Sequence, residues 1–424
     1  MKYKIRLIYE FAFFFALAGA FGYYFQQDPS PTSPSASSVA QGDETPQPHS
    51  SAIDTHSGAQ RLAHSQRERV TEGFTLVPEV GSGLVRLINM SGSTVHTWNM
   101  DADRARLLPN GHLAVLHGSK WGLTVQPWRD LQNVIREYDW DGNLVWEFAL
   151  PGRIHHDLTP LPNGNFLSLH RIDLPVEYSA TLTNPRLQGL QLRSDEIFEV
   201  NRNKEIIWSW KAHEHLDPNS CGKYPCPKKL RKSIKNGKKP FDWTHTNTTS
   251  ILPENKWYDQ GDKRFKPGNI LTVIRNMSTV FLIDRESGDV VWSYTGDYRG
   301  GLQYAHEAQM IEKGLPGAGN ILIFDNGTER LESLVLEIDP TTEQLIWVYD
   351  VGNKFYSRVQ GAMQRFPNGN TLISEDMGPR IFEVTPTKET VWTYHGNTLR
   401  IARAKRYFPD YCEEFKELKL WDTE

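Results

Sequence analysis

The sequence predicts an all-β protein, a six-bladed β-propeller preceded by an N-terminal signal or anchor segment and a disordered linker. The first observation is a phrase that occurs six times: a turn, two or three residues that are mostly β-branched, and then a tryptophan. Self-similarity of this kind is typical of repeat folds, and four antiparallel strands per repeat describe a propeller blade. The tryptophans that end the phrases are Trp98, Trp146, Trp208, Trp292, Trp347 and Trp392.

The second observation is a strand–turn–strand frame built around Pro-Asn-Gly. It occurs at residues 109–111, 162–164 and 367–369, and two looser copies with insertions occur at 251–269 and 310–320. We interpret each frame as an inner strand, a tight turn and the next strand of one blade. Helical periodicity is scarce beyond the first 25 residues, and 13 Trp with 32 Gly favour a turn-rich β protein.

The N-terminal region precedes the repeats and has a different composition. Residues 1–26 combine Lys2, Lys4 and Arg6 with an apolar run over 11–25, which is typical of a secretory signal or an uncleaved membrane anchor. Both alternatives export the chain, so we expect a periplasmic protein that is soluble or tethered to the inner membrane through this segment. Residues 27–70 are rich in Pro and Ser and predict a flexible linker.

The remaining residues, 71–424, form the predicted propeller. Its first unit, residues 74–98, lacks an inner strand, and we expect residues 399–405 after the last tryptophan to supply it. A blade built from both ends of the chain closes the ring and removes the open sheet edges. The net charge of −4 argues against nucleic acid as a partner, because phosphates are collected by a positive field. The sequence leaves the oligomeric state open.

The longest insertion spans residues 211–240. Cys221 and Cys226 lie close together in it and predict a small disulfide, while Cys412 is left over. The insertion also carries a basic run, which is either a solvated surface or a loop that gathers anionic substrates. The run consists of Lys228, Lys229, Arg231, Lys232, Lys235, Lys238 and Lys239.

Histidines recur near the start of the inner strands. His156 lies eight residues before Gly164, and we place His245 and His306 at the matching position of the two looser copies. Because the inner strands of a propeller face a common axis, the three imidazoles should converge although they lie far apart in the sequence. Arg275 follows the strand 270–274 in the blade of His245 and is the cation expected beside them.

Three imidazoles with a guanidinium allow two kinds of chemistry. Three histidine ligands with an open position can hold a catalytic zinc ion, but a fixed cation such as Arg275 repels a metal. The second kind is transfer of an anionic group, in which arginine binds the oxyanion, one neutral imidazole attacks, and another moves a proton. We therefore expect neither a metal nor a cofactor.

Four phrases in this order resemble the bacterial arylsulfate sulfotransferases, over a region from about residue 73 to the C-terminal tail. That family moves a sulfuryl group from a phenolic sulfate ester to another phenol without a nucleotide donor. The absence of a phosphate-cradling Gly-rich loop agrees with this. The phrases are His155-His156-Asp157 before Leu-Pro-Asn-Gly-Asn, Asp242-Trp-Thr-His245-Thr-Asn247, the strand that ends at Arg275, and Ala305-His306-Glu307-Ala308 followed by Ile323-Phe-Asp-Asn326-Gly.

The resemblance implies a role for each matching residue. His306 would be the nucleophile that becomes a sulfohistidine, while His156, His245 and Arg275 would bind the sulfuryl oxygens, with one histidine serving as acid or base. The resemblance also implies substrate contacts for Asn247, Asn326 and His155. Side chains alternate between the two faces of a strand, so we expect His155 to face away from His156 and to support the site indirectly. The implied partners are small aryl sulfates and phenols.

Two other functions remain open from the sequence. A hydrolase or lyase could use the same ring of residues, with water or another acceptor in place of the phenol. A non-catalytic propeller could serve as a binding scaffold, because a fold does not fix a function. The natural donor and acceptor are not identified by any motif.

Overall fold

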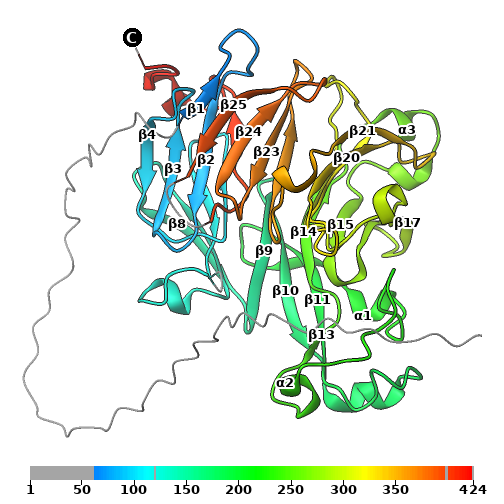
Figure 1. Cartoon of the computed structure of the whole chain (residues 1–424). Coiled ribbons are helices and arrows are strands. Elements are labelled where there is room, and N and C mark those ends of the chain that lie inside the picture. The colour runs from blue at the N-terminus through cyan, green and yellow to red at the C-terminus, as the bar shows by residue number, and fades with distance from the viewer. Residues whose placement is uncertain (1–61, 119–120, 397–399, 423–424) are drawn as a thin grey trace, which may run out of the picture. The chain divides into compact units, whose positions relative to one another are not determined.

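The computed structural model describes residues 62–118, 121–396 and 400–422. The predicted signal or anchor segment and linker residues 27–61 lie outside the described residues. Six sheets, antiparallel except for one short added strand, form the six blades of a β-propeller, which confirms the predicted fold class (Figure 1). Among the described residues, no helix has both the length and the apolar character needed to cross a bilayer.

The blades follow the chain in order. Blade 1 contains β26 (Lys405–Tyr407), β2 (Phe74–Glu79), β3 (Leu84–Ile88) and β4 (Thr94–Trp98). Blade 2 contains β5 (Arg104–Leu107), β6 (Leu113–Leu116), β7 (Val134–Tyr138) and β8 (Leu144–Ala149). Blade 3 contains β9 (Arg153–Pro160), β10 (Phe166–Asp173), β11 (Leu192–Val200) and β12 (Ile206–Lys211), with β13 (Phe241–Asp242) added in parallel to β11.

The other three blades have the same strand order. Blade 4 contains β14 (Thr246–Ile251), β15 (Ile270–Ile274), β16 (Thr279–Ile283) and β17 (Val290–Tyr294). Blade 5 contains β18 (Glu307–Met310), β19 (Ile321–Asp325), β20 (Leu334–Ile338) and β21 (Leu345–Tyr349). Blade 6 contains β22 (Ala362–Arg365), β23 (Thr371–Glu375), β24 (Arg380–Val384), β25 (Thr390–His395) and an outermost strand, β1 (Leu62–Ser65).

The helices are short and lie in the connections. The α-helices are α1 (Ala212–His215), α2 (Lys232–Lys235) and α3 (Lys256–Asp259). The 3-10 helices are Trp128–Asp130, Val176–Thr181, Lys263–Phe265, Arg275–Met277, Tyr298–Gly300, Gly352–Lys354 and Glu413–Glu417.

Both ends of the described chain enter the ring. Strand β26 pairs with β2 in the register Phe74↔Tyr407, so the C-terminal segment supplies the inner strand of blade 1 as predicted. The strand begins only at Lys405, the last residue of the predicted segment, and Ile401 adds a single bridge to Glu79. At the other end, β1 pairs with β25 (Figure 1). The predicted linker boundary at residue 70 is therefore too late, because Leu62–Ser65 already belongs to blade 6.

The repeated tryptophans join neighbouring blades. The indole N–H donates to a turn carbonyl of the next blade in five of the six copies, for example from Trp146 to Arg202 O at 3.0 Å and from Trp392 to Met90 O at 3.0 Å. The indole nitrogen of Trp292 is buried and has no hydrogen-bond partner among the described residues. The phrase that predicted the repeat thus has a packing role, since each turn carbonyl receives a donor in a partly dry interface.

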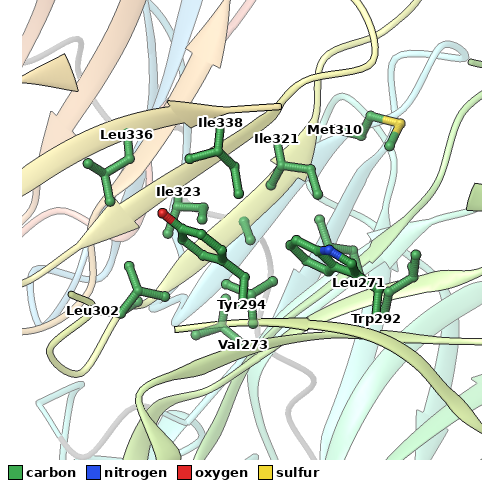
Figure 2. Packing of buried hydrophobic residues seen from close by; sticks show 14 of the residues in the cluster. Leu271, Val273, Trp292, Tyr294, Leu302, Met310, Ile321, Ile323, Leu336 and Ile338 are labelled. Atoms are coloured by element: carbon green, nitrogen blue, oxygen red, sulfur yellow. The ribbon is translucent and has the colours of Figure 1, made fainter. Parts of the chain in front are cut away.

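The hydrophobic core lies between the blades. Figure 2 shows the largest cluster, in which Leu271 and Val273 of blade 4 face Ile321 and Ile323 of blade 5. Each sheet is apolar on both faces here because each of its faces meets another blade. The ring of blades is consequently stabilised by burial between sheets, and it fixes where the inner strands begin.

Candidate active site

His306 lies immediately before β18, and the neighbours of its ring nitrogen Nδ1 determine which nitrogen of the ring carries the proton. Its Nδ1 lies 2.7 Å from Asn326 Oδ1 and 3.1 Å from the carbonyl oxygen of Tyr304. A carbonyl oxygen can only accept, so Nδ1 carries the proton and Nε2 carries the lone pair. The side chain is buried, and burial together with the charges of Arg275 and Arg403 lowers the pKa of His306 well below its usual value. His306 is therefore neutral at neutral pH and presents Nε2 as a nucleophilic atom.

Asn326 fixes the orientation of His306. Its amide nitrogen donates to Ser357 O at 2.7 Å and to Gln360 O at 2.8 Å, which leaves its Oδ1 pointing at the imidazole. All hydrogen-bonding groups of this buried side chain are used within the protein. Asn326 thus acts on His306 and is not placed to bind a substrate directly, which differs from the contact expected from the sequence.

His245 pairs with a carboxylate. Its Nδ1 donates to Asp242 Oδ2 at 2.5 Å, and its side chain keeps an exposed fraction of 20%. Burial alone would raise the pKa of Asp242, but the charge and hydrogen bond of His245 bring it below its usual value. The aspartate therefore stays ionised and orients the ring, so that Nε2 of His245 is available to exchange a proton with a bound group.

His156 is linked to a second aspartate through His155. The two Nδ1 atoms lie 2.6 Å apart, and Nε2 of His155 lies 3.1 Å from Asp195 Oδ1. Because the carboxylate accepts from His155 Nε2, neutral His155 must accept at Nδ1, and His156 must donate there. Burial lowers the pKa of His155 to about 4, against the opposing charge of Asp195. The chain Asp195–His155–His156 thus leaves the lone pair of His156 at Nε2.

The histidines from blades 3, 4 and 5 do converge. The rings of His156 and His245 have centroids 4.9 Å apart in an edge-to-face arrangement. After burial and the charge of His155, the charges of His245 and His306 further lower the pKa of His156, which places all three within electrostatic range. No group of three His, Cys, Asp or Glu side chains among the described residues is arranged to hold a metal ion.

The repeat register differs from the prediction at His245. Leu161, Leu252 and Ile311 each open the turn of their blade by donating to the residue that closes it. Counting back five residues from each gives His156, Asn247 and His306, so His245 lies two residues before the matching position. The three histidines still converge, because the strand pairing is irregular near them. The register shifts at 168–170 against β9 and at 246–248 against β15. The predicted equivalence was wrong, although the residue does reach the cluster.

Backbone conformation explains how adjacent residues point to one place. His156 and His245 have positive φ values of 66° and 53°. Such a left-handed residue interrupts strand alternation, so His155 contacts His156 instead of facing away from it. Tyr304, Gln360 and Arg403 have φ values of 58°, 58° and 54° at the start of other inner strands. A left-handed residue thus recurs near the start of several inner strands, although not at one repeat position, and the side chain that it carries decides the chemistry.

Arg275 provides the cation expected beside the histidines. Its Nη1 donates to Asn276 Oδ1 at 2.8 Å, and its guanidinium lies 4.8 Å from the ring centroid of Tyr304. Its Nε is buried and has no hydrogen-bond partner among the described residues. The insertion supports this segment, since Lys223 N donates to Met277 O at 3.0 Å. Arg275 thus keeps donors for an oxyanion.

The insertion at 211–240 borders this segment. Cys221 and Cys226 are joined by a disulfide, and Cys412 is a free, buried thiol. The seven basic residues named above are all exposed. Their exposure is compatible with either predicted role, a solvated surface or a substrate-gathering loop.

Asn247 and Arg403 are buried next to the backbone of His306. Asn247 is buried, donates to Ala305 O at 3.3 Å, and its Oδ1 has no partner among the described residues. Arg403 donates to Asn247 O at 2.9 Å and to His306 O at 3.3 Å. It also lies 3.8 Å from Asp157 and 3.7 Å from Glu307, in a buried charge network. This network stabilises the backbone that carries Asn247 and His306.

Sequence reasoning missed Arg403, Asp195 and Asp242. Arg403 comes from the segment that closes the ring, where no local motif precedes it. Asp242 and Asp195 could have been found as acids close to the histidine positions, because a ring nitrogen that is not used for chemistry generally has an acceptor. The arrangement as a whole offers a nucleophilic nitrogen, a proton carrier and a guanidinium around one small volume.

Comparison with known proteins finds similar folds at low sequence identity. None of the curated proteins matches the sequence. A protein of unknown function from Bacteroides caccae has a similar structure, with a TM-score of 0.50, 13% identity, and 79% of this chain and 99% of that chain covered. The periplasmic gluconolactonase of Pseudomonas aeruginosa (TM-score 0.46, 11% identity, 79% and 99% covered) is also similar. Such low identities show the propeller fold alone.

The sequence also matches a family model over residues 129–397, and the model is described as arylsulfotransferase (ASST). The matched region begins in blade 2 and ends after β25, so it includes His156, His245, Arg275 and His306. A match over more than half of the chain shows the family, and the chain therefore belongs to the arylsulfotransferase (ASST) family.

Proposed function

We propose that this protein transfers a sulfuryl group from a phenolic sulfate ester to a phenol through a sulfohistidine on His306. The observation that carries the proposal is the tautomer of His306. Its Nδ1 meets only oxygen acceptors, so the lone pair sits at Nε2, within electrostatic range of Arg275. A neutral imidazole with a fixed lone pair beside a guanidinium suits attack on an anionic sulfur centre.

In the first half-reaction, His306 Nε2 donates its lone pair to sulfur and the bond from sulfur to the phenolic oxygen breaks. The leaving oxygen takes the bonding pair and a proton from a protonated histidine, for which His245 has the ionised partner Asp242. The imidazole keeps its Nδ1 proton, because the amide oxygen of Asn326 accepts a hydrogen bond but not the proton. The resulting sulfo-imidazolium is a reactive intermediate.

In the second half-reaction, the acceptor phenol loses its proton to the same histidine and attacks sulfur. The bond from sulfur to His306 Nε2 breaks, and the ring regains its lone pair. Atoms and protons balance over the cycle, and no other reactant is needed. Separate half-reactions predict ping-pong kinetics.

Positive charge supplies the stabilisation of the transition state. Negative charge moves onto the phenolic oxygen as its bond to sulfur lengthens, while the sulfuryl oxygens remain anionic. Arg275 is in place before binding, and the protonated histidine forms together with the bound anion. Each such donor contributes about 3–4 kcal/mol by analogy with oxyanion donors. The neutral forms of His156, His245 and His306 all leave Nε2 without a proton, so binding of the anion should be accompanied by uptake of a proton.

We also propose that the protein is exported and works in the periplasm. The basic and apolar composition of residues 1–26 supports this. The Cys221–Cys226 disulfide agrees with an oxidising compartment. Fractionation of cells that express the full chain tests it, and the proposal predicts enzyme activity and the oxidised cysteine pair in the periplasmic or inner-membrane fraction.

A chromogenic aryl sulfate tests the proposed reaction. Release of the chromophore should require added phenol and should yield the sulfated phenol. His306→Ala should abolish release with its melting temperature preserved, and His395→Ala, at an exposed position in β25, serves as the matched control. Release at the same rate without phenol would show hydrolysis instead. Full activity of His306→Ala would refute the assignment of the nucleophile.

A further inference from the structure

Two arginines with unused donors face each other beside the histidines. Arg153 on β9 and Arg171 on β10 are direct partners in the antiparallel register. The Nε atom of each is buried and has no hydrogen-bond partner among the described residues. Like charges placed directly opposite each other on a sheet are destabilising, so this pair costs stability in the free protein. A bound anion would relieve both the repulsion and the unused donors.

The neighbouring acids do not neutralise the pair. The charge of Asp103 acts on Arg153, but burial and the charge of Arg171 still hold the pKa of Arg153 below its usual value. Asp195 lies opposite Arg171 on β11, but its carboxylate is occupied by His155, Thr244 Oγ1 at 2.7 Å and Thr246 N at 2.6 Å. Asp173, farther along β10, is paired with Arg193 through hydrogen bonds of 2.5 and 2.8 Å.

Their other contacts leave the arginines available. Arg153 donates from Nη2 to Gly118 O at 2.7 Å, and Arg171 makes no side-chain hydrogen bond or ion pair among the described residues. Within the described part of the chain, Asp242 is the acid near Arg171 that has an unused oxygen, but it lies beyond ion-pair distance and is paired with His245. A charge-assisted hydrogen bond to a guanidinium is strong, so unused donors at this position favour an anionic ligand.

The pair lies within range of the reacting residues. Arg153 and His155 are two residues apart on β9, and the charge of Arg171 acts on both His155 and His156. Both residues are only partly buried, so part of each arginine is accessible although its Nε is not. A group bound here would be close to, but distinct from, the sulfuryl group held between His306 and Arg275.

We propose that Arg153 and Arg171 form a subsite for a second anionic group, a carboxylate, carried on the aromatic ring of the donor and of the acceptor. The inference rests on the proposed function and adds the substrate class to it. The same subsite serves both half-reactions because His306 occupies one side of sulfur. The acceptor oxygen must therefore enter along the line by which the leaving oxygen departed, with its ring in the same place. The favoured substrates are carboxylated phenols and their sulfate esters.

The test compares two donors that differ in one charge. The first is 4-carboxyphenyl sulfate, and the second is its methyl ester, which keeps the ring and the sulfate but removes the carboxylate. Initial rates give kcat/KM for each donor with a fixed phenol acceptor. The comparison is made in the wild type, Arg171→Gln, Arg153→Gln and a control, Arg193→Gln, whose guanidinium is already paired with Asp173.

We expect kcat/KM for the carboxylated donor to fall about 10- to 100-fold in Arg171→Gln and in Arg153→Gln, the range for lost hydrogen bonds to a charged group. The value for the methyl ester should change less than about twofold, because that donor leaves the subsite empty. Arg193→Gln should leave the ratio of the two donors unchanged. Melting temperatures should stay level or rise, since each glutamine removes a like-charge contact.

Each result decides between separate claims. Equal losses for both donors would overturn the subsite and make the arginines part of sulfuryl binding. A ratio of the two donors that is unchanged by either substitution would also overturn it. Absence of turnover with every aryl sulfate in the wild type would instead refute the proposed function. The two failures are therefore distinguishable.

Discussion

Replacement of Arg275 by lysine tests how the site recognises a sulfuryl group. The substitution keeps the positive charge but removes the planar fork of donors. In the structure, Nη1 is used by Asn276 Oδ1 at 2.8 Å, while Nε is buried without a partner among the described residues. We therefore assign Nε and Nη2 to the sulfuryl oxygens. A single ammonium cannot reproduce both contacts while it also replaces the bond to Asn276.

The magnitude follows from the contacts that are lost. One charge-assisted hydrogen bond contributes about 1.5–3 kcal/mol, and each 1.4 kcal/mol is about a factor of ten. Arg275→Lys should accordingly lower kcat/KM by about 10- to 150-fold, and Arg275→Met should lower it further because the charge is lost as well. The loss should include kcat, since the interaction strengthens as charge develops in the transition state.

Initial rates with a chromogenic aryl sulfate and a phenol acceptor measure this effect. Arg264→Lys is the matched control, because that arginine belongs to the same blade and pairs with Asp262 at 2.7 Å on the surface. Melting temperatures of all variants should agree within a few degrees. An unchanged kcat/KM in Arg275→Lys would refute bidentate recognition, and a loss that follows a fall in melting temperature would point to the fold instead.

Other predictions concern proton transfer, pH and blade packing. Asp242→Asn should lower kcat about 10- to 100-fold at an unchanged melting temperature, because His245 loses the ionised acceptor that orients its ring; an unchanged kcat would contradict its role. The folded-state pKa of His155 is about 4 against 6.5 when unfolded, so the unfolded chain binds the proton first as pH falls. His155 alone should therefore lower the free energy of unfolding by about 3 kcal/mol between pH 7 and 4, and denaturant titration of His155→Gln should show a smaller drop than the wild type. Trp392→Phe should lower the free energy of unfolding by about 1–3 kcal/mol, because it removes a buried hydrogen bond to blade 1. In the same titration Trp292→Phe should lower it less, because the indole nitrogen of Trp292 has no partner among the described residues.

The architecture could be predicted because its signals are local and repeated. Each Trp phrase marks one outer strand, since the indole fills the gap to the next blade and, in five of the six copies, its N–H donates to a turn carbonyl. The Pro-Asn-Gly turn is equally local: Gly164 has φ of 83°, and Asn163 Oδ1 accepts from Asn165 N at 3.1 Å. Six such units leave one inner strand missing, so closure by the C-terminal segment follows from counting.

The site could be predicted only in part, because strand irregularities do not repeat with the sequence. His156 and His306 share a register position, but His245 reaches the cluster from two residues earlier through a shift in pairing. Alternation likewise failed for His155, since the left-handed backbone of His156 turns the two rings toward each other. Arg403 gave no signal, because its role depends on ring closure and on contacts with backbone carbonyls.

The most direct test of the account is mass spectrometry of the protein mixed with an aryl sulfate and no acceptor. We predict one sulfuryl group on the peptide that contains His306, its loss when a phenol is added, and no adduct in His306→Ala. Turnover by the wild type without such an adduct, or an adduct on a different residue that phenol discharges, would contradict the central claim.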